Sequence, residues 1–412
     1  MPHNAAMQTA PAATSGPVRI ASLLARRILL PLKVKVEHAS HVRRESENVV
    51  VECRLSNGTV GYGEGVPREY VTGETCSRSL DILKRTNWAS VSRDVHSFEE
   101  AVTVVDALQL PAEPDDDRGM VGNAARCAVE LAILDAFGRV FDKSFSAVAA
   151  LPEFAEIYEP KPKVRYTGAL TTKGMIKGRL FAWYWKFLDP ADVKIKVGMP
   201  NCDDVARLRI FRRIMPRLPF RIDANEAWPA NDVVARIRAL EPFRLSLVEQ
   251  PVKHADVPTL SEVRKQISTP IMLDESLCTM IDGERAANGG WGDVFNIRLS
   301  KCGGFLRSLR LALFAKRHGL RCQLGCHPGE SGILSAAGRH FACSVAGLVA
   351  VEGSFDDYTL KQRLTEEDLT FSKRGAWAPA LTRPGLGVTI DREGLDSVTK
   401  EIVPLFEATP HG

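Results

Sequence analysis

The sequence has no apolar run that approaches the roughly 18–20 residues needed to cross a membrane. Its first residues, MPHNAAMQTAPAATSGP, have neither the basic segment nor the apolar segment of a secretory signal. Small residues and proline are common there, so we expect a disordered tail over residues 1–17. These absences favour a protein that neither spans a membrane nor is exported.

Cysteine is present, but without the spacing of a metal site or a disulfide framework. The nine cysteines are scattered, their number is odd, and none forms a Cys-x-x-Cys pair. Cys322 and Cys326 are the closest in sequence. We interpret them as buried thiols, with a metal or redox site as the weaker alternative. Free thiols are typical of a reducing compartment, so we expect a cytoplasmic protein.

An excess of charge of one sign is also missing. The chain has 54 Lys and Arg against 50 Asp and Glu, a net charge of +4 over 412 residues. This balance gives no reason to expect a nucleic-acid partner, although it suits a small anionic substrate. The composition, 45% hydrophobic and 25% charged, is that of a globular protein. The length favours two domains.

The N-terminal region has strand patterns first and helix patterns after them. PLKVKVEHA and NVVVECRLSNGTVGYGEG alternate apolar and polar residues, and Asn57-Gly58 is a strong hairpin turn. SRSLDILKR, SFEEAVTVVDALQL and NAARCAVELAILDAFGRV then carry apolar residues at helical spacing. This order predicts an α+β domain over residues 18–155.

The second region alternates strand and helix patterns in units of similar length. Eight strand candidates lie at 164–170, 192–198, 220–224, 245–250, 270–275, 294–299, 321–326 and 348–353. Helix patterns separate them, which predicts a TIM-like (β/α)7β barrel over residues 156–360. Residues 361–412 return to irregular and hairpin-like sequence. We expect them to pack on the first domain and to complete an α+β capping domain with it.

Three acidic residues recur at near-equal intervals within the barrel region. Asp223, Glu249 and Asp274 are 26 and 25 residues apart, and each follows an apolar, β-branched run. Lys301 follows 27 residues later. Because functional residues of such barrels lie at the carboxyl ends of the strands, the three carboxylates are expected to converge there. They would form a site for a hard cation, Mg²⁺ or Mn²⁺. A single acid of this kind could equally cap a helix or form an ion pair.

Two lysines on one strand provide the candidate base. Lys194 and Lys196 are two residues apart in VKIKVG, so their side chains point to the same face of the strand. If that face is the barrel interior, mutual repulsion lowers the pKa of each, and one can act as a base. The alternative is a pair of ordinary edge lysines. Lys301, on the far side of the barrel, could return the proton to the opposite face.

Taken together, VKIKVG, RIDANEAW, LVEQP, IMLDES and NIRLSKCGG resemble the muconate lactonizing enzyme subgroup of the enolase superfamily. GYGEGVPREYVTGET also resembles its capping domain, so the resemblance covers nearly the whole chain. It implies that Asp223, Glu249 and Asp274 bind Mg²⁺ and that a lysine pair exchanges the α-proton of a carboxylate through an enediolate. It also implies that Lys196 and Lys301 are the acid and base and that Lys194 tunes Lys196. Asn225 and Glu275 would support the metal ligands.

The residues that select the substrate are harder to identify from the sequence than the metal ligands and the lysines. Candidates in the capping loops include Arg43 and Tyr70, and candidates after the last strands are His327, Glu330 and Glu352. A solvated surface role, or a helix cap for His327, is the competing interpretation of each. The same capping loops contain His38, His41, Arg44, Arg68 and Glu69. The Asp-x-Asp pair that dipeptide epimerases of this subgroup carry after strand eight is absent.

We therefore expect a Mg²⁺-dependent racemase or epimerase of an amino-acid-like or related carboxylate. The alternatives are a muconate-type cycloisomerase and a syn-dehydratase of the succinylbenzoate synthase type, because all three share the same first step. A barrel that only binds a ligand would be expected to lack one of the ligands or lysines. The expected partners are a small carboxylate and further copies of the chain.

Overall fold

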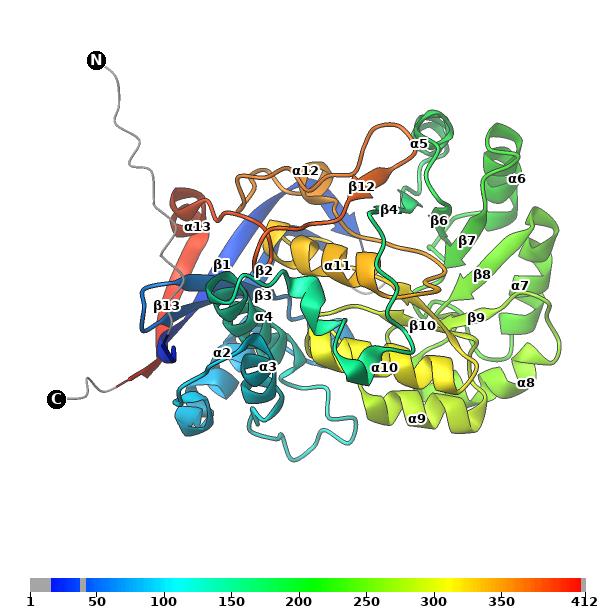
Figure 1. Ribbon diagram of the computed structural model, residues 1–412. Helices are drawn as coiled ribbons and strands as arrows, with labels where there is room; N and C mark the ends of the chain where they lie inside the picture. The colour runs from blue at the N-terminus through cyan, green and yellow to red at the C-terminus, as the bar shows by residue number, and fades with distance from the viewer. Residues whose placement is uncertain (1–15, 38–41, 409–412) are drawn as a thin grey trace, which may run out of the picture.

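The computed structural model describes residues 16–37 and 42–408 (Figure 1). Most of the predicted N-terminal tail, together with His38 and His41, lies outside these ranges. Within them, no helix has both the length and the apolar character of a membrane span. All nine cysteines are free thiols.

One part of the molecule is a four-stranded antiparallel sheet that joins both ends of the described chain. Its strands, in spatial order, are β13 (Thr399–Glu407), β1 (Ile20–Glu37), β2 (Val42–Leu55) and β3 (Val60–Gly65). The β2–β3 hairpin turns at Gly58, whose φ of 84° is one that glycine adopts without strain. The C-terminal strand β13 pairs along the outer edge of β1.

Helices α2 (Cys76–Arg85), α3 (Phe98–Asp106) and α4 (Asn123–Val140) cover one face of this sheet. Helices α2 and α3 begin where a Thr or Ser side chain accepts a hydrogen bond from the first turn. Strand β3 packs directly on α4 through the alternating glycines Gly61 and Gly63. A Cβ atom at either glycine would lie 2.2 or 2.1 Å from the α4 backbone, so only glycine allows this approach.

The other part is a barrel of parallel strands, each followed by a helix (Figure 1). Seven strands are hydrogen-bonded in chain order: β5 (Gly168–Leu170), β6 (Val193–Lys196), β7 (Phe220–Asp223), β8 (Leu245–Glu249), β9 (Ile271–Leu273), β10 (Val294–Ile297) and β11 (Arg321–Leu324). The helices that alternate with them are α5 (Met175–Leu188), α6 (Asp204–Ile214), α7 (Val233–Leu240), α8 (Leu260–Arg264), α9 (Met280–Gly289), α10 (Phe305–Arg317) and α11 (Gly332–Ser344).

Val351 takes the eighth strand position. It forms a parallel bridge with Leu324, and its carbonyl oxygen accepts a hydrogen bond of 2.9 Å from the N–H of Thr167, just before β5. The barrel therefore closes, and the predicted (β/α)7β barrel with an α+β capping domain is confirmed. The exact boundaries 18–155, 156–360 and 361–412 stay predictions.

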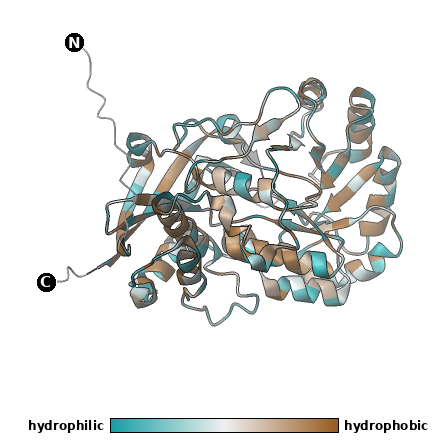
Figure 2. Cartoon of the chain, in the orientation of Figure 1, coloured by the Kyte–Doolittle hydropathy of each residue, from teal (hydrophilic) through white to brown (hydrophobic). Residues whose placement is uncertain are grey.

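The barrel strands are rich in apolar residues (Figure 2), which polar and charged residues interrupt, such as the two lysines of β6 and the arginine of β7. All residues of β7, β9 and β10 are buried. Because parallel strands all point the same way, their carboxyl ends meet at one mouth. The capping domain lies against that mouth through Glu64 of β3, whose carboxylate accepts hydrogen bonds from the backbone N–H groups of Ser331 and Leu334.

Candidate active site

Three carboxylates lie at the carboxyl ends of neighbouring barrel strands. Asp223 and Glu249 are the last residues of β7 and β8, and Asp274 directly follows β9. They are 5%, 0% and 0% exposed. Strand register aligns Asp223 with Glu249 on one side and with Lys196 of β6 on the other. The regular spacing in the sequence thus becomes a row of charged groups across the barrel mouth.

Lys194 lies among the carboxylates. Its Nζ is 3.4 Å from Asp223 Oδ2, 3.5 Å from Glu249 Oε2 and 2.8 Å from Glu352 Oε1. Burial lowers the pKa of Lys194, but the three carboxylates outweigh burial and raise the pKa above its ordinary value. The repulsion expected between the two lysines therefore does not govern Lys194, which stays an ammonium.

Lys196 behaves as the candidate base should. Its pKa is lowered from the ordinary value, chiefly by burial; Lys194 lowers it further and Asp223 opposes the shift. Because Val193 and Ile195 are the more buried residues of β6, the two lysines share its other face. A lysine with a lowered pKa, beside carboxylates, can accept a proton more readily than a surface lysine.

The last acid, Asp274, is held by two cations. The guanidinium of Arg298 donates to Asp274 Oδ2, and Lys301 Nζ donates to Asp274 Oδ1 at 2.8 Å. Burial would raise the pKa of Asp274, but Arg298 and Lys301 reverse this and hold it below its ordinary value. Lys301 Nζ also donates to the carbonyl oxygens of Asp274 and Asn296, at 2.6 and 2.8 Å.

Glu249 lies between cationic groups and the other acids, with Lys194 Nζ 3.5 Å from its Oε2 and Arg298 Nη2 3.6 Å from its Oε1. Asn296 Nδ2 donates to its Oε1 at 2.8 Å, and Arg221 Nη1 lies 3.3 Å from its Oε2. Its pKa is nevertheless raised well above the ordinary value, first by burial and then by the neighbouring Asp223 carboxylate.

An internal charge network below the row was missed by the sequence analysis. Arg221 is fully buried and pairs with Asp192 Oδ2 and Glu352 Oε1, both at 2.6 Å, as well as with Glu249. The signal was present, because Arg221 is two residues before Asp223 and so faces the same way. Arg298 and Asn296 have the same relationship on β10 and its end.

The two residues expected to support the metal ligands lie together. The N–H of Asn225 donates to Asp223 Oδ1 at 3.0 Å, and Asn225 Nδ2 donates to Glu275 Oε1 at 3.2 Å. Asn225 has a φ of 42°, in the left-handed region that asparagine tolerates better than most residues. This turn brings the backbone N–H back onto the Asp223 carboxylate.

The candidate substrate-binding residues divide into three places. Arg43 and Tyr70 form a pair in the capping domain, in which Arg43 Nη2 donates to the Tyr70 hydroxyl at 2.8 Å and the guanidinium lies 5.4 Å from the ring centre. His327 and Glu330 share the loop after β11, where Glu330 accepts from the His327 N–H at 2.6 Å. Glu352 is engaged by Lys194 and Arg221, so it balances their charge from inside the barrel.

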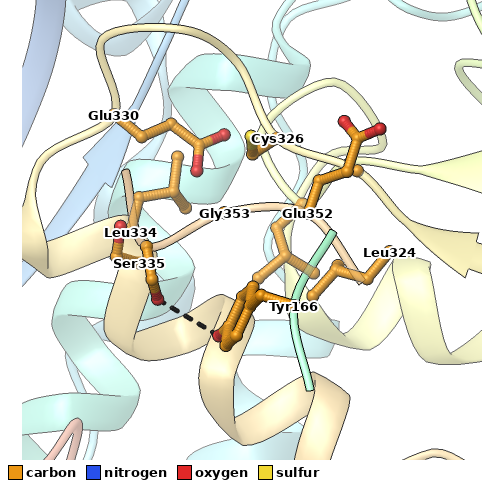
Figure 3. Close-up of a pocket in the computed structure, with 12 residues that line it drawn as sticks. Tyr166, Leu324, Cys326, Glu330, Leu334, Ser335, Glu352 and Gly353 are labelled. Atoms are coloured by element: carbon orange, nitrogen blue, oxygen red, sulfur yellow. Dashed lines mark hydrogen bonds between the residues drawn. The ribbon is translucent and has the colours of Figure 1, made fainter. Parts of the chain in front are cut away.

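A pocket opens between the ends of β11 and the eighth strand position (Figure 3). Tyr166, Cys326, Glu330 and Glu352 line it, and the Glu330 carboxylate points toward Cys326. Burial raises the pKa of Glu330 to about 8. Burial also holds the pKa of His327 well below its ordinary value, so its imidazole is neutral. Its Nδ1 has no hydrogen-bond partner among the described residues.

The three carboxylates also fit a divalent cation by their chemistry. In the part of the chain that is described, no three His, Cys, Asp or Glu side chains are arranged around a common metal position. Lys194, Arg298 and Lys301 lie against the carboxylates instead. A buried set of carboxylate oxygens from three adjacent strands is still the donor set that Mg²⁺ prefers.

The fold and the charged row are those of a class of enzymes: capped barrels whose active site lies at the carboxyl ends of the strands. Residues 190–394 match the family "Enolase C-terminal domain-like". The chain belongs to the enolase superfamily.

The relatives are racemases and epimerases. A hydrophobic dipeptide epimerase of Enterococcus faecalis is 29% identical over 79% of this chain and 88% of its own length. An N-succinyl-L-Arg/Lys racemase of Bacillus cereus is 25% identical over 93% of this chain and 98% of its own. The crystal structure of a dipeptide epimerase from Enterococcus faecalis, complexed with Mg and the dipeptide L-Leu-L-Tyr, has a TM-score of 0.76 and 26% identity, and the match covers 90% of this chain and 99% of that one. These relatives support racemase or epimerase activity, within the isomerases.

Proposed function

We propose that this protein removes the proton α to a carboxylate and returns it, as a Mg²⁺-dependent racemase or epimerase of an amino-acid-like substrate. The observation that carries the proposal is the position of Lys196, a partly buried lysine with a lowered pKa in register with Asp223. Such a lysine can serve as a general base. The activities named for the Enterococcus and Bacillus relatives support the same outcome.

Asp223, Glu249 and Asp274 are the residues that would hold the metal ion. A bound divalent cation supplies Lewis-acid stabilisation of the negative charge that develops on the substrate carboxylate. Asn225 and Glu275 keep Asp223 oriented through the hydrogen bonds described above.

The remaining roles follow from charge. Lys194, held as an ammonium by three carboxylates, attracts the substrate carboxylate and keeps the pKa of Lys196 low. Arg43 and Tyr70 in the capping domain, with His327 and Glu330 after β11, are proposed to contact the rest of the substrate. A homo-oligomer and a cytoplasmic location stay predictions.

One observation favours a second candidate function. Lys301, expected to act on the opposite face of the substrate, is fully buried and its ammonium is enclosed by Asp274 and Asn296. Cycloisomerisation of a muconate-type diacid and syn-elimination of water need proton transfer on one face only. Both therefore remain compatible with Lys196 as the single acting lysine.

Solvent-deuterium exchange tests the proposal. The Mg²⁺-loaded protein is incubated in D₂O with N-acyl amino acids, dipeptides and muconate-type diacids, and the α-position is followed by NMR. We expect exchange in at least one substrate class and its loss in Lys196→Met. The matched control is Lys177→Met, on the exposed face of α5. If a folded, Mg²⁺-loaded protein exchanges no α-proton in any class, the proposal is wrong.

A further inference from the structure

Helix α5 carries apolar side chains on two opposite faces. Its inner face contains Gly178, Ala182 and Trp185, and the helix packs on α6 (Figure 1). A Cβ atom at Gly178 would lie 2.9 Å from the Phe211 ring, so this face is already in close contact. Within the described part of the chain, only the inner face is covered. The outer face is the α5 stripe, which consists of Ile176, Leu180, Trp183 and Phe187.

The α5 stripe is exposed, although its residues are of the kind that form a protein interior. Ile176, Leu180 and Phe187 are 78%, 66% and 77% exposed, and Trp183 is 44% exposed. Positions three or four apart lie on one side of a helix, so the four side chains form one continuous strip. The exposed positions of the neighbouring α6 carry arginines instead. A helix that faces water needs no such stripe, which indicates that α5 has a partner.

Further aromatic groups widen the surface and hold it in place. The Trp183 and Phe187 rings stack with their centres 6.0 Å apart. Beside them, the Tyr184 hydroxyl is 2.9 Å from the hydroxyl of Tyr358 in α12 (Asp356–Thr359). Rings that are already fixed lose little conformational freedom when a partner binds.

The exposed area is large enough for a partner of protein size. At ~200 Å² for a fully exposed aromatic side chain, the four that are exposed on α5, Phe181 among them, present on the order of 400 Å². Ile176 and Leu180 raise this to roughly 500–600 Å². A stable interface takes about 800 Å² from each partner, so the patch with its polar rim is of the right size. We propose that the α5 stripe is the surface through which two copies of this chain associate.

An antiparallel pairing of the two α5 helices also matches their charges. The helix is preceded by Lys173 and ends at Asp189, whose side chain is 64% exposed while it pairs with Arg165. A two-fold axis near the middle of the stripe brings Lys173 of one copy beside Asp189 of the other. The same axis sets Ile176 against Phe187 and places the positive end of each helix dipole beside the negative end of the other.

An anionic lipid surface is the competing occupant, because α5 has three basic residues and no acidic one. Acidic groups at the rim of the patch oppose it. Asp189 lies at one end of the stripe, and Asp357 and Asp368 lie near Tyr358. An anionic surface would repel all three carboxylates, whereas a second copy presents charges of both signs.

The test measures the mass of the full chain by sedimentation velocity at several micromolar concentrations. Leu180→Glu combined with Phe187→Glu puts a charge in each half of the stripe. We expect the wild type to associate and this variant to sediment at half the mass or less, with a dissociation constant raised ~100-fold or more because unpaired charges would have to be buried. The matched control is Ile281→Glu combined with Val349→Glu, the same change at two exposed sites away from α5, which should keep the wild-type mass.

Cross-linking tests the orientation of the two helices. Leu180→Cys should form a disulfide-linked dimer under mild oxidation, because the two-fold axis brings the two copies of this residue together, whereas Arg209→Cys on the exposed face of α6 should not. A wild type that stays monomeric, a double glutamate variant that keeps the full mass, or equal cross-linking of the two cysteine variants overturns the inference. Sedimentation of a monomer with phosphatidylglycerol vesicles, lost in the double glutamate variant, overturns it in favour of a lipid surface.

Discussion

The side-chain amide of Asn123 donates a hydrogen bond of 2.7 Å to the backbone carbonyl oxygen of Lys301. The same amide donates to the carbonyl oxygen of Cys278 at 3.0 Å. Asn123 is the first residue of α4, so one capping-domain side chain fixes the loops that follow β9 and β10. The loop that carries Lys301 is therefore set by a domain other than the barrel.

Replacing Asn123 by leucine should destabilise the fold and lower activity. The change removes both hydrogen bonds and leaves two buried carbonyl oxygens without a donor, at a cost of about 1–3 kcal/mol in the free energy of unfolding. Urea denaturation measures this cost, and Asn231→Leu, at an exposed site, is the control. Equal midpoints for the two variants would show that the contact contributes nothing.

Arg221→Met should be strongly destabilising. It leaves Asp192, Glu249 and Glu352 without their shared cation, and breaking a buried ion pair typically costs about 3–5 kcal/mol. Arg221→Lys keeps the charge but has a single donor group, so an intermediate loss is expected. The measurement is guanidinium denaturation, with exposed Arg209→Met as control. A loss no greater than that of the control would contradict the network.

Gly63→Ala should disrupt the packing of β3 on α4. The added Cβ would lie 2.1 Å from the Ala128 carbonyl oxygen, so helix and strand must separate, and we expect a loss of about 1–3 kcal/mol or more. Gly174→Ala, whose Cβ would meet nothing closer than 4.0 Å, is the matched control. Thermal denaturation of the two variants should separate them by several degrees.

The buried carboxyl of Glu74 should make stability fall as pH rises. Burial raises its pKa from 4.5 to about 7, although Thr72, Gly122 and Ala124 donate hydrogen bonds to it. The folded state therefore binds a proton that the unfolded state has already lost between these pH values. Its stabilising contribution is complete below about pH 4.5 and is lost as pH rises through about 7, up to ~3 kcal/mol.

Glu74→Gln provides the comparison, because a glutamine does not titrate. The free energy of unfolding of the wild type minus that of the variant, measured from pH 4.5 to 8, should decrease steadily as the pH rises. A difference that stays constant across this range would rule out the raised pKa.

Mg²⁺ should stabilise the folded protein before any substrate is added. A ligand present at 100 times its dissociation constant adds about 2.7 kcal/mol to the free energy of unfolding. The melting temperature should therefore rise with added Mg²⁺ and return when EDTA removes it. Glu249→Gln should reduce the Mg²⁺-dependent rise, whereas exposed Glu262→Gln should keep it. The same rise in both variants would exclude Glu249 as a ligand.

Most of the fold could be predicted from the sequence, because strand and helix patterns alternate without interruption in the barrel region. It also located Asp223, Glu249 and Asp274, since each ends a strand and the ends of parallel strands meet. The roles of Arg221 and Arg298 were not predicted, because an arginine within an apolar run does not by itself indicate a function. Only the two-residue spacing of Arg221 from Asp223, and of Arg298 from Asn296, indicates that they share a face with these residues.

Interactions across the barrel could not be predicted from neighbours in the chain. Lys194 and Lys196 are adjacent on one strand, so their repulsion dominated the expectation for both pKa values. In the fold, Glu249 and Glu352 reach Lys194 from other strands and raise its pKa. Glu352 lies between Lys194 and Arg221, a position that depends on which strands meet when the barrel closes, and its contact with substrate stays a prediction.

The pairing of β1 with β13 has a consequence for how the chain is made. Ile28 pairs with Thr399, so 371 residues must be synthesised before the partner of β1 is available. At ~5–20 residues per second this takes roughly 20–75 seconds. Every barrel strand leaves the ribosome before β13, while the outer edge of β1 stays open to other strands. A chain that stops short of residue 399 would therefore carry all of the charged row but also a permanently unpaired, aggregation-prone edge.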